Sequence, residues 1–504
     1  MTSEPHKKHS YGQILKSSSI IGGAQGINYL ISMVRVKLVA VLLGPSGVGL
    51  VGLYVSATGL VSTVAGLGIS SSGVREVAEA HGTGKAEQIA RTVKTLRRAC
   101  WVTGILGWLL CAAFSYPLSL WTFGSGERAW AIAMLGATLL LGAISGGQSA
   151  LLQGTRRIGD IARFNVLCAI IGTIVAVGLY GWLGQKGIVP VLIVTAAVNL
   201  GSSWWYARRI QTVRVAQSWR ETIANSRRLV GLGLAFMYSA LTVAIVALAI
   251  RSLIVRKLGL DASGIYQAVW AISGMFAGFI LGAMGTDFYP RLTAVANDNE
   301  QVNRLVNEQT EIGVLLALPG LLGTLAFAPW VMHIFYSAKF VSGASLLPWF
   351  VLGVFGQVIS WPMGFILMAK GASKWVSANA TIFSIIYFFL VVVLLGKMGL
   401  VGCGVAYAVL YALHIAGMRL LSRHLTGFRW TPHTVKLLLS GAGLIGIAYA
   451  LAWLLSPEWA AICNLFLLVI AAILSLRGII LRLGTDHRLV VRMMWLPGFR
   501  WLAA

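Results

Sequence analysis

The chain contains LLGPSGVGL at Leu42–Leu50, and a similar stretch, KLGLDASGI, follows at Lys257–Ile265. Gly44 of the first stretch aligns with Gly259 of the second, and both glycines interrupt long apolar runs. Many membrane transporters are built from duplicated halves with the substrate site between them. The paired stretches therefore predict that the chain folds as two related bodies.

Further landmarks recur in the same order and at a nearly constant interval along the chain. They pair Gly49 with Gly264; Arg75 with Arg291; Pro117, Phe123 and Ser125 with Pro329, Phe335 and Ser337; Gly154 and Arg157 with Gly371 and Lys374; and LGQKGIV from Leu183 with LGKMGLV from Leu395. One such match could arise by chance in glycine-rich apolar sequence, but several in one order indicate a duplication.

The composition requires that most of the surface faces lipid, because 57% of the 504 residues are hydrophobic and only 11% are charged. Apolar runs of about 20 residues, long enough to cross the hydrocarbon as helices, recur between Ile20 and Leu481. The runs are continuous rather than alternating, which favours helices over a barrel. The predicted spans are 18–43, 48–72, 99–121, 129–152, 162–183, 187–207, 229–257, 263–287, 311–335, 344–369, 375–396, 399–420, 435–455 and 459–481.

The expected fold is all-α and membrane-spanning, with about fourteen helices arranged as two parallel six-helix repeats and a C-terminal helical pair. Six spans per repeat is an even number, so both copies enter the membrane in the same direction. The predicted parts are a cytoplasmic N-terminus 1–13, an N-lobe 14–207 (helices 1–6), a basic cytoplasmic linker 208–228, a C-lobe 229–420 (helices 7–12), an additional pair 421–481 (helices 13–14) and a basic cytoplasmic tail 482–504. The pair is either an accessory or part of the substrate site.

The distribution of basic residues predicts the orientation. Lys and Arg near span ends accumulate on the cytoplasmic side, and most of the 40 fall on one side of the predicted topology. The other side receives Arg128, Lys186, Arg256, Lys257, Lys339 and Lys397. Both termini are thus expected in the cytoplasm, and the first fifteen residues lack the pattern of a signal peptide. The net charge of +25 follows from this topology and from anionic inner-leaflet lipids, so no nucleic-acid partner is expected.

Four segments together resemble a known group: LLGPSGVGLVGL from Leu42, GLGISSSGVREVA from Gly66, QGTRRIGD from Gln153 and GAMGTDFYPRLTAVANDN from Gly282. They resemble the polysaccharide transport family, the Wzx-type flippases of the multidrug/oligosaccharidyl-lipid/polysaccharide exporter superfamily. The loop after the second span lacks the G-x-x-x-D-[RK]-x-G-[RK] pattern of the major facilitator superfamily, which also has parallel six-helix repeats.

This resemblance implies an alternating-access flippase that moves an undecaprenyl diphosphate-linked oligosaccharide, an O-antigen or related surface glycan unit, to the outer leaflet of a bacterial cytoplasmic membrane. Many members of that family have twelve helices, whereas fourteen is the count of the related lipid II flippases, so a peptidoglycan-precursor flippase is the main alternative. The implied partners are the lipid-linked substrate, membrane lipids, and a glycan polymerase and chain-length regulator of the same pathway.

Three cations inside predicted spans are candidate substrate ligands: Arg35, Lys37 and Arg251. Charges are costly in a span, and Arg35 and Arg251 lie at nearly the same depth in the first helix of each repeat. A guanidinium fork suits a diphosphate. Arg35 and Lys37 are about 200° apart on a helix and cannot both face one cavity. The alternative for each is that the long side chain extends to the membrane surface.

Coupling and gating have four candidates. Asp287 and Arg291 lie four residues apart at the end of the eighth span, where they could form an ion pair or relay a proton. Pro319 and Pro362 are candidate hinges, or else static kinks, because proline removes a backbone donor. No cofactor or metal is expected, and a proton gradient, a sodium gradient or the membrane potential could drive transport.

Two other functions are disfavoured. Few acids accompany the cations in the spans, which suits an anionic cargo better than the cationic drugs of a multidrug exporter. A membrane-embedded polyprenyl-dependent glycosyltransferase or polymerase would need large outer loops with acidic residues. The predicted outer loops are short and offer only Glu127, Asp261 and Glu458 as acids. We therefore expect a transporter and not an enzyme.

Overall fold

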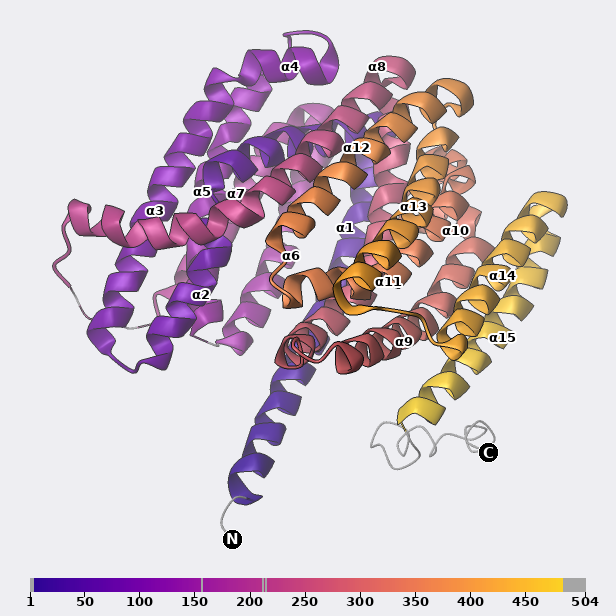
Figure 1. Ribbon diagram of the computed structural model, residues 1–504. Coiled ribbons are helices and arrows are strands. Elements are labelled where there is room, and N and C mark those ends of the chain that lie inside the picture. The colour runs from indigo at the N-terminus through magenta and orange to yellow at the C-terminus, as the bar shows by residue number, and fades with distance from the viewer. Residues whose placement is uncertain (1–3, 156, 211–212, 214, 484–504) are drawn as a thin grey trace. The chain divides into compact units, whose positions relative to one another are not determined.

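The computed structural model describes residues 4–155, 157–210, 213 and 215–483 (Figure 1). These residues form fifteen α-helices and two 3-10 helices and contain no strand. The elements are α1 (Glu4–Gly66), α2 (Ile69–Gly82), α3 (Ala86–Ala113), α4 (Ser115–Phe123), α5 (Ala129–Gly154), α6 (Ile158–Leu183), η1 (Gly184–Gly187), α7 (Ile188–Ala207), α8 (Trp219–Ala294), α9 (Asn299–Ala326), α10 (Ala328–Phe335), η2 (Ala338–Ser345), α11 (Leu347–Ala369), α12 (Ser373–Met398), α13 (Val401–Thr426), α14 (Pro432–Leu454) and α15 (Pro457–Leu483).

Eleven helical segments within the described residues are long and apolar enough to cross a membrane. Three of them, Gly26–Gly66, Gly159–Ala207 and Met237–Met275, have 41, 49 and 39 residues, about twice what one crossing needs. Each overlaps two of the predicted spans, so counting them twice gives fourteen crossings. The expectation of an all-α, multi-pass membrane protein is confirmed.

Two of the long helices are broken by glycine. Gly44 in α1 has φ 67° and ψ −175°, and Gly259 in α8 has φ 87° and ψ 176°. A positive φ is unfavourable for a residue with a Cβ, so glycine alone adopts this backbone without strain. These two glycines are the ones that the repeated sequence aligns, and each separates two successive crossings. Their common conformation supports the duplication.

A second pair of turns repeats at the same interval. Gly184 ends α6 with φ 55° and ψ −132°, and Gly399 ends α12 with φ 58° and ψ −144°. The sequence alignment pairs Leu183 with Leu395, and therefore Gly184 with Gly396, three positions before Gly399. The structure corrects it, because backbone conformation pairs Gly184 with Gly399, at the same interval that separates Gly44 from Gly259. Several glycines are close together here, so similarity of letters alone could not fix the register.

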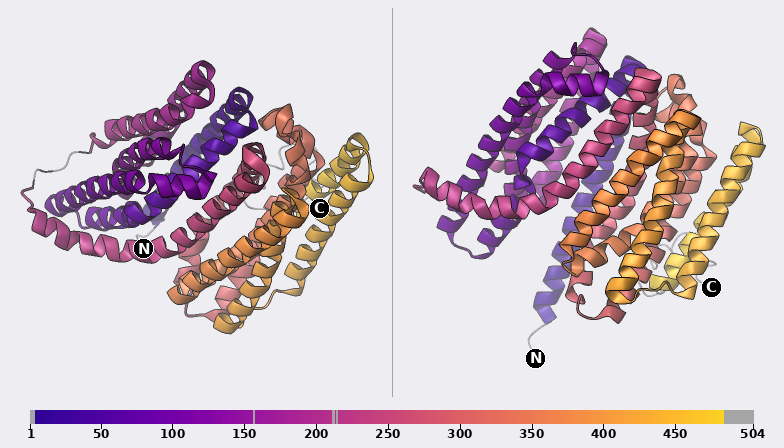
Figure 2. Two further views of the ribbon diagram at one scale, coloured as in Figure 1. Left: turned by 90° about the horizontal axis from the view of Figure 1, so that it is seen from above. Right: turned by 45° about the horizontal axis from the view of Figure 1, so that its top comes forward.

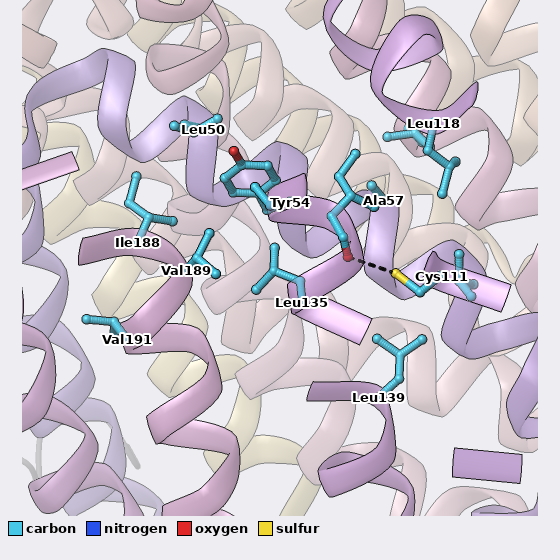
Figure 3. Close-up of a cluster of buried hydrophobic side chains, with 14 of the residues drawn as sticks. Leu50, Tyr54, Ala57, Cys111, Leu118, Leu135, Leu139, Ile188, Val189 and Val191 are labelled. Atoms are coloured by element: carbon cyan, nitrogen blue, oxygen red, sulfur yellow. Dashed lines mark hydrogen bonds between the residues drawn. The ribbon is translucent and has the colours of Figure 1, made fainter. Parts of the chain in front are cut away.

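The chain divides into two compact units, Met1–Gly264 with Phe335–Ser337, and Ile265–Ile334 with Ala338–Ala504. The core of the first unit lies among α1, α3, α5 and α7 (Figure 3). Its buried side chains include Leu50, Tyr54, Cys111, Leu135, Leu139 and Ile188. The buried Cys111 thiol donates to the Ile132 carbonyl at 3.1 Å.

The segment after α7 is fastened to α3 within the first unit. Lys94 Nζ donates to the Val215 carbonyl, and Arg98 Nη1 donates to Thr222 Oγ1 at 2.7 Å. The Gln217 side-chain amide donates to Thr95 Oγ1 at 2.8 Å. The second part of the predicted 208–228 linker is helical, since α8 begins at Trp219. The division into lobes, linker and tail remains our proposal, and most of the tail lies outside the described residues.

The core of the second unit joins α8, α9, α11 and α13 through Phe288, Leu292, Val306, Ile366, Leu367 and Met418. Helices α14 and α15 lie side by side in both views (Figures 1 and 2), and both pack against α9. The C-terminal pair is therefore part of the second unit. Gly441 of α14 allows close packing, because a Cβ there would lie 3.1 Å from the Phe355 ring.

Candidate functional site

Arg35 lies in the first crossing of α1, nine residues before the break at Gly44, and its side chain is half-buried. Its Nη1 atom lies 3.5 Å from the position that a Cβ on Gly172 would occupy, so the guanidinium faces α6. Lys37 is also half-buried and makes electrostatic or hydrogen-bonding contacts of its own. Arg35 thus points into protein rather than straight out of the helix toward lipid.

Arg251 lies eight residues before the break at Gly259 in α8, and only 8% of it is exposed. Its Nη1 atom donates to the Ala247 carbonyl of its own helix at 3.2 Å. A fully buried guanidinium costs several kcal/mol unless it is paired, and Arg251 makes further interactions. This conformation therefore keeps Arg251 away from water and from any ligand in bulk lipid.

The gating candidates fall on continuous helices. Pro319 lies inside α9 and Pro362 inside α11, and neither helix is broken at its proline. Asp287 lies in α8, but its side chain is outside the described residues, so its pairing with Arg291 stays a prediction. Arg291 is exposed at the end of α8 and has a partner. The marked breaks occur instead at Gly44 and Gly259, which the sequence identified as repeat landmarks but not as hinges.

An aromatic pocket of about 240 Å³ lies in the second unit, between α8, α11 and α13. Trp270 packs edge to face against Phe350 and Tyr407, with ring centroids 6.1 and 5.5 Å away. The Tyr407 hydroxyl donates to Gln357 Oε1 at 3.2 Å, so the side-chain nitrogen of Gln357 is the donor that remains on that amide. An apolar ring face beside amide and hydroxyl groups suits a sugar ring.

The sequence alone does not single out this pocket. Trp270 and Gln357 lie inside predicted spans, but so do other polar residues such as Gln148 and Asn199. Phe350 and Tyr407 carried no distinguishing signal, because aromatic residues are common in apolar helices. Their roles follow from packing between helices that are distant from one another in the sequence.

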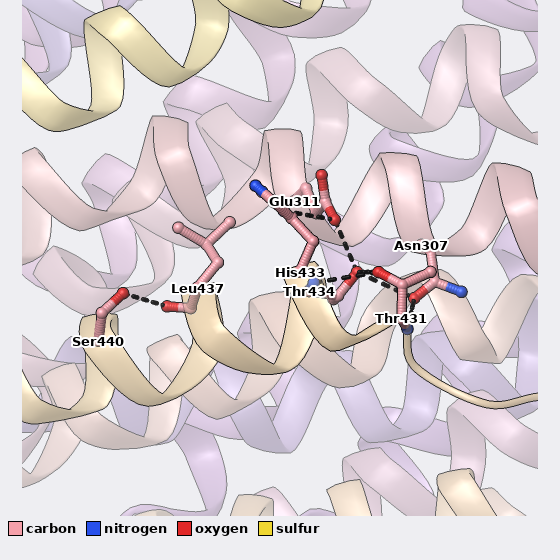
Figure 4. Close-up of polar contacts among 7 residues, drawn as sticks. All are labelled: Asn307, Glu311, Thr431, His433, Thr434, Leu437 and Ser440. Atoms are coloured by element: carbon pink, nitrogen blue, oxygen red, sulfur yellow. Dashed lines mark hydrogen bonds and ion pairs between the residues drawn. The ribbon is translucent and has the colours of Figure 1, made fainter.

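A polar network that the sequence analysis missed surrounds Glu311 of α9 (Figure 4). The Glu311 side chain is 13% exposed, and its Oε1 accepts a 2.7 Å hydrogen bond from Thr434 Oγ1. His433 Nδ1 lies 3.3 Å from the same oxygen. One turn away, Asn307 Oδ1 accepts from the backbone amide of Thr431, which caps α14.

This network fixes the C-terminal helical pair to the second unit. Asn307 and Glu311 are four residues apart and share one face of α9, where they meet the first turn of α14. The N-terminal amides of a helix lack partners within that helix, and Asn307 supplies one. Glu311 additionally places a carboxylate near the positive end of the α14 dipole, which is stabilising.

Comparisons with known proteins agree with this architecture. A family model described as "Polysaccharide biosynthesis protein" matches residues 14–296. The Lipid III flippase of Escherichia coli strain K12 is 22% identical over 390 residues, which cover 75% of this chain and 91% of that flippase. The lipid II flippase MurJ, in an inward closed conformation, matches with a TM-score of 0.67 and 14% identity, over 92% of this chain and 99% of the MurJ chain.

An inward-facing multidrug resistance MATE family transporter of the MOP superfamily matches with a TM-score of 0.60 and 16% identity, over 79% of this chain and 95% of the transporter. At these identities the solved structures establish a shared fold. The fold is that of membrane transporters, which agrees with the expectation of a transporter rather than an enzyme.

Proposed function

Because the chain belongs to the polysaccharide biosynthesis protein family, we propose that it is a flippase for a lipid-linked oligosaccharide. The cargo would be an undecaprenyl diphosphate-linked unit, for O-antigen or a related surface glycan. It would pass from the inner to the outer leaflet of a bacterial cytoplasmic membrane by alternating access. The Lipid III flippase, which is similar over most of its length, supports a lipid-linked cargo.

The observation that carries this proposal is a buried or half-buried arginine in the first crossing of each repeat. Arg35 and Arg251 lie within apolar segments, where a charge is costly and needs a compensating role. A diphosphate carries the opposite charge, and its oxygens match the planar guanidinium fork. Arg35 would serve as a headgroup ligand, with Lys37 on the other side of the helix reaching toward the membrane surface.

Alternating access would expose Arg251 in a second conformation. The helix breaks at Gly44 and Gly259 let the two crossings of α1, and those of α8, change angle without disrupting internal helical hydrogen bonds. Pro319 and Pro362 are proposed as secondary bends, because each removes one backbone donor from its helix. Asp287 and Arg291 are proposed as a coupling pair, driven by protons, sodium or the membrane potential.

The aromatic pocket of the second unit would contact the glycan. A sugar ring presents C–H groups that pack on the Trp270 face, while hydroxyls hydrogen-bond to Gln357. The basic residues place both termini in the cytoplasm in this proposal. Partners would be the glycan polymerase and chain-length regulator that use the flipped product.

The test is translocation of a fluorescent undecaprenyl diphosphate-linked oligosaccharide in vesicles that contain the purified protein. Arg35→Gln and Arg251→Gln should each lower the initial rate at least about tenfold, since each removes one charged hydrogen-bonding group. Arg163→Gln is the control, because the Arg163 side chain is 71% exposed on α6. Unchanged rates in both variants, with the wild-type protein active, would refute the cationic site.

A lipid II-type peptidoglycan precursor is the second candidate cargo. It is included because the similarity to the MurJ fold extends over 92% of this chain. Both labelled lipids should be offered to the same vesicles in competition. Faster translocation of the peptidoglycan precursor would replace the O-antigen-type proposal.

A further inference from the structure

In addition to the aromatic pocket of the second unit, the structure has a cavity of about 870 Å³ in the first unit. Its walls are α3, α5 and α7. It lies at the ends of these helices that the basic residues assign to the cytoplasmic side. Two arginines line it, Arg97 from α3 and Arg208 after α7, and no acidic side chain lines it among the residues that the structure describes. The cavity therefore has a positive character that the transport proposal does not use.

Tryptophans surround this cavity. Trp101 and Trp204 line it and are 51% and 52% exposed, and the adjacent Trp205 is 48% exposed. Tryptophan with half its surface exposed, at the end of an apolar span, is typical of the membrane interface. The opening therefore lies at the depth of lipid headgroups rather than in bulk water or in the centre of the bilayer.

Arg208 is held in place by stacking. Its Cζ atom lies 3.6 Å from the centroid of the Trp205 ring and 4.9 Å from that of Trp204. Stacking uses the face of the guanidinium and leaves its N–H groups, which lie in its plane, available as donors. Such a group binds phosphate oxygens with less loss of side-chain freedom than an unrestrained arginine.

A neutral donor completes the lining. Gln148 Oε1 accepts a short hydrogen bond from Ser203 Oγ, so the Gln148 side-chain nitrogen is the part of the amide that can donate to a ligand. Gly201, also in the lining, has open space around it, since a Cβ there would meet nothing within 4 Å. The cavity thus combines two guanidinium groups, an amide donor, apolar walls and room for a headgroup with the start of its chains.

We propose that this cavity binds the headgroup of an anionic phospholipid from the cytoplasmic leaflet. The charge is complementary, because that leaflet is rich in anionic lipids, which attract basic residues near its surface. Phosphate bound by Arg97 and Arg208 would bridge α3 to the end of α7. The site belongs to one unit and is independent of the cargo that the protein carries.

The test measures retained lipid on the purified full-length protein by native mass spectrometry, after equilibration with phosphatidylglycerol or phosphatidylcholine. Phosphatidylglycerol should bind more tightly, and Arg97→Gln combined with Arg208→Gln should weaken it at least about tenfold. The matched control is Arg75→Gln with Arg163→Gln, which removes the same charge from exposed positions of the same unit. Equal weakening by both double variants would overturn the proposal, because it would indicate nonspecific attraction.

A second variant keeps both arginines and fills the cavity. Gly201→Leu should reduce phosphatidylglycerol retention, whereas Gly178→Leu, at an exposed and equally open position on α6, should not. If Gly201→Leu retains lipid normally, the cavity is not the binding site. Two further measurements test the source of the phosphate. If free diphosphate stabilises the protein as strongly as phosphatidylglycerol does, the assignment to a lipid is overturned. Displacement of bound phosphatidylglycerol by polyprenyl diphosphate would also overturn it.

Discussion

Gly49 and Gly264, aligned by the repeat, face each other where α1 meets α8 within the first unit. A Cβ on Gly49 would lie 2.5 Å from the Leu260 carbonyl oxygen, and a Cβ on Gly264 would overlap the Pro45 carbonyl. Pro45 and Leu260 are themselves equivalent positions of the repeat, separated by the same interval as the two glycines. The contact is thus reciprocal, with the same position of each copy against the backbone of the other, as two related helices packed about a local twofold axis would give.

Alanine at either of these glycines should force the two helices apart. We expect Gly49→Ala and Gly264→Ala each to destabilise the protein by about 1–3 kcal/mol, since backbone cannot yield as a flexible side chain can. Thermal unfolding of the purified protein in detergent measures this effect. Gly59→Ala is the control, because nothing lies within 4 Å of its Cβ position and alanine favours a helix. Equal melting temperatures for all three variants would contradict the close contact.

The helix breaks at Gly44 and Gly259 make a separate prediction, about conformation rather than contact. Space is open at both positions, but a φ of 67° or 87° with ψ near 180° is a backbone conformation essentially restricted to glycine, and it costs an alanine about 1–3 kcal/mol. Gly44→Ala and Gly259→Ala should therefore slow translocation as well as lower stability. Gly66→Ala, at an open position of α1 without a positive φ, should do neither. Normal transport by both variants would show that the breaks are not needed for the transport cycle.

Asp160 forms the centre of a basic cluster at the start of α6. Its side chain is 16% exposed, and Arg157, Arg209 and Arg163 approach its carboxylate at 3.5, 3.9 and 4.0 Å. Asp160→Asn leaves three arginines without their shared anion and should cost about 1–2 kcal/mol, the cost being limited because the arginines are exposed. Glu87→Gln is the control.

Glu87 pairs with Arg91 on the surface of α3 at 2.8 Å, with both side chains exposed. Such exposed pairs contribute less than about 1 kcal/mol. The Glu87→Gln variant should therefore unfold close to the wild-type temperature. A larger loss for Glu87→Gln than for Asp160→Asn would contradict the assignment of Asp160 as the cluster's centre.

The network of Glu311 and Thr434 predicts coupled effects on the C-terminal pair. Glu311→Leu and Thr434→Val should each lower stability by about 1–3 kcal/mol, and the double variant should cost less than their sum, because each single change leaves one polar partner buried. Ser440→Ala is the control, since Ser440 is exposed and bonds only to Leu437 of its own helix among the contacts drawn (Figure 4). Additive losses would mean that the two side chains act independently.

Sequence reasoning succeeded where the signal is local and periodic. Continuous apolar runs predict helices and their number. The aligned glycines mark the repeat, but the sequence does not show that Gly44 and Gly259 break their helices with a positive φ. The register near Gly184 and Gly399 was misplaced by three positions, since neighbouring glycines there give the same letters in two alignments.

The sites were harder to predict, because their residues are distant in sequence. Glu311 and Thr434 are in contact although α9 and α14 are far apart along the chain. No regular spacing in the sequence therefore predicts that they form a pair. Arg97 and Arg208 line one cavity only because α3 and α7 both pack on α5. Arg35 and Arg251 could be selected, since charge within an apolar span is unusual by itself, but their surroundings depend on helix packing.

The aromatic pocket gives the final prediction, which separates sugar recognition from diphosphate binding. Trp270→Leu keeps an apolar side chain but removes the flat face on which a sugar ring could pack. We expect it to slow translocation of the full lipid-linked oligosaccharide about three- to tenfold, from a contact contribution of about 1 kcal/mol. Trp270→Leu should slow translocation of a lipid diphosphate carrying a single sugar less, because fewer sugar rings of that substrate contact the pocket.

The matched change is Trp375→Leu, at a tryptophan of α12 that is 46% exposed and outside the pocket. Both variants should be measured with the two lipids in the same vesicles, so that a general loss of folded protein lowers both rates alike. A proportional loss with both lipids would place the role of Trp270 in packing against Phe350 and Tyr407. A selective loss with the longer glycan would make the pocket a saccharide subsite, since only sugar contacts distinguish the two substrates.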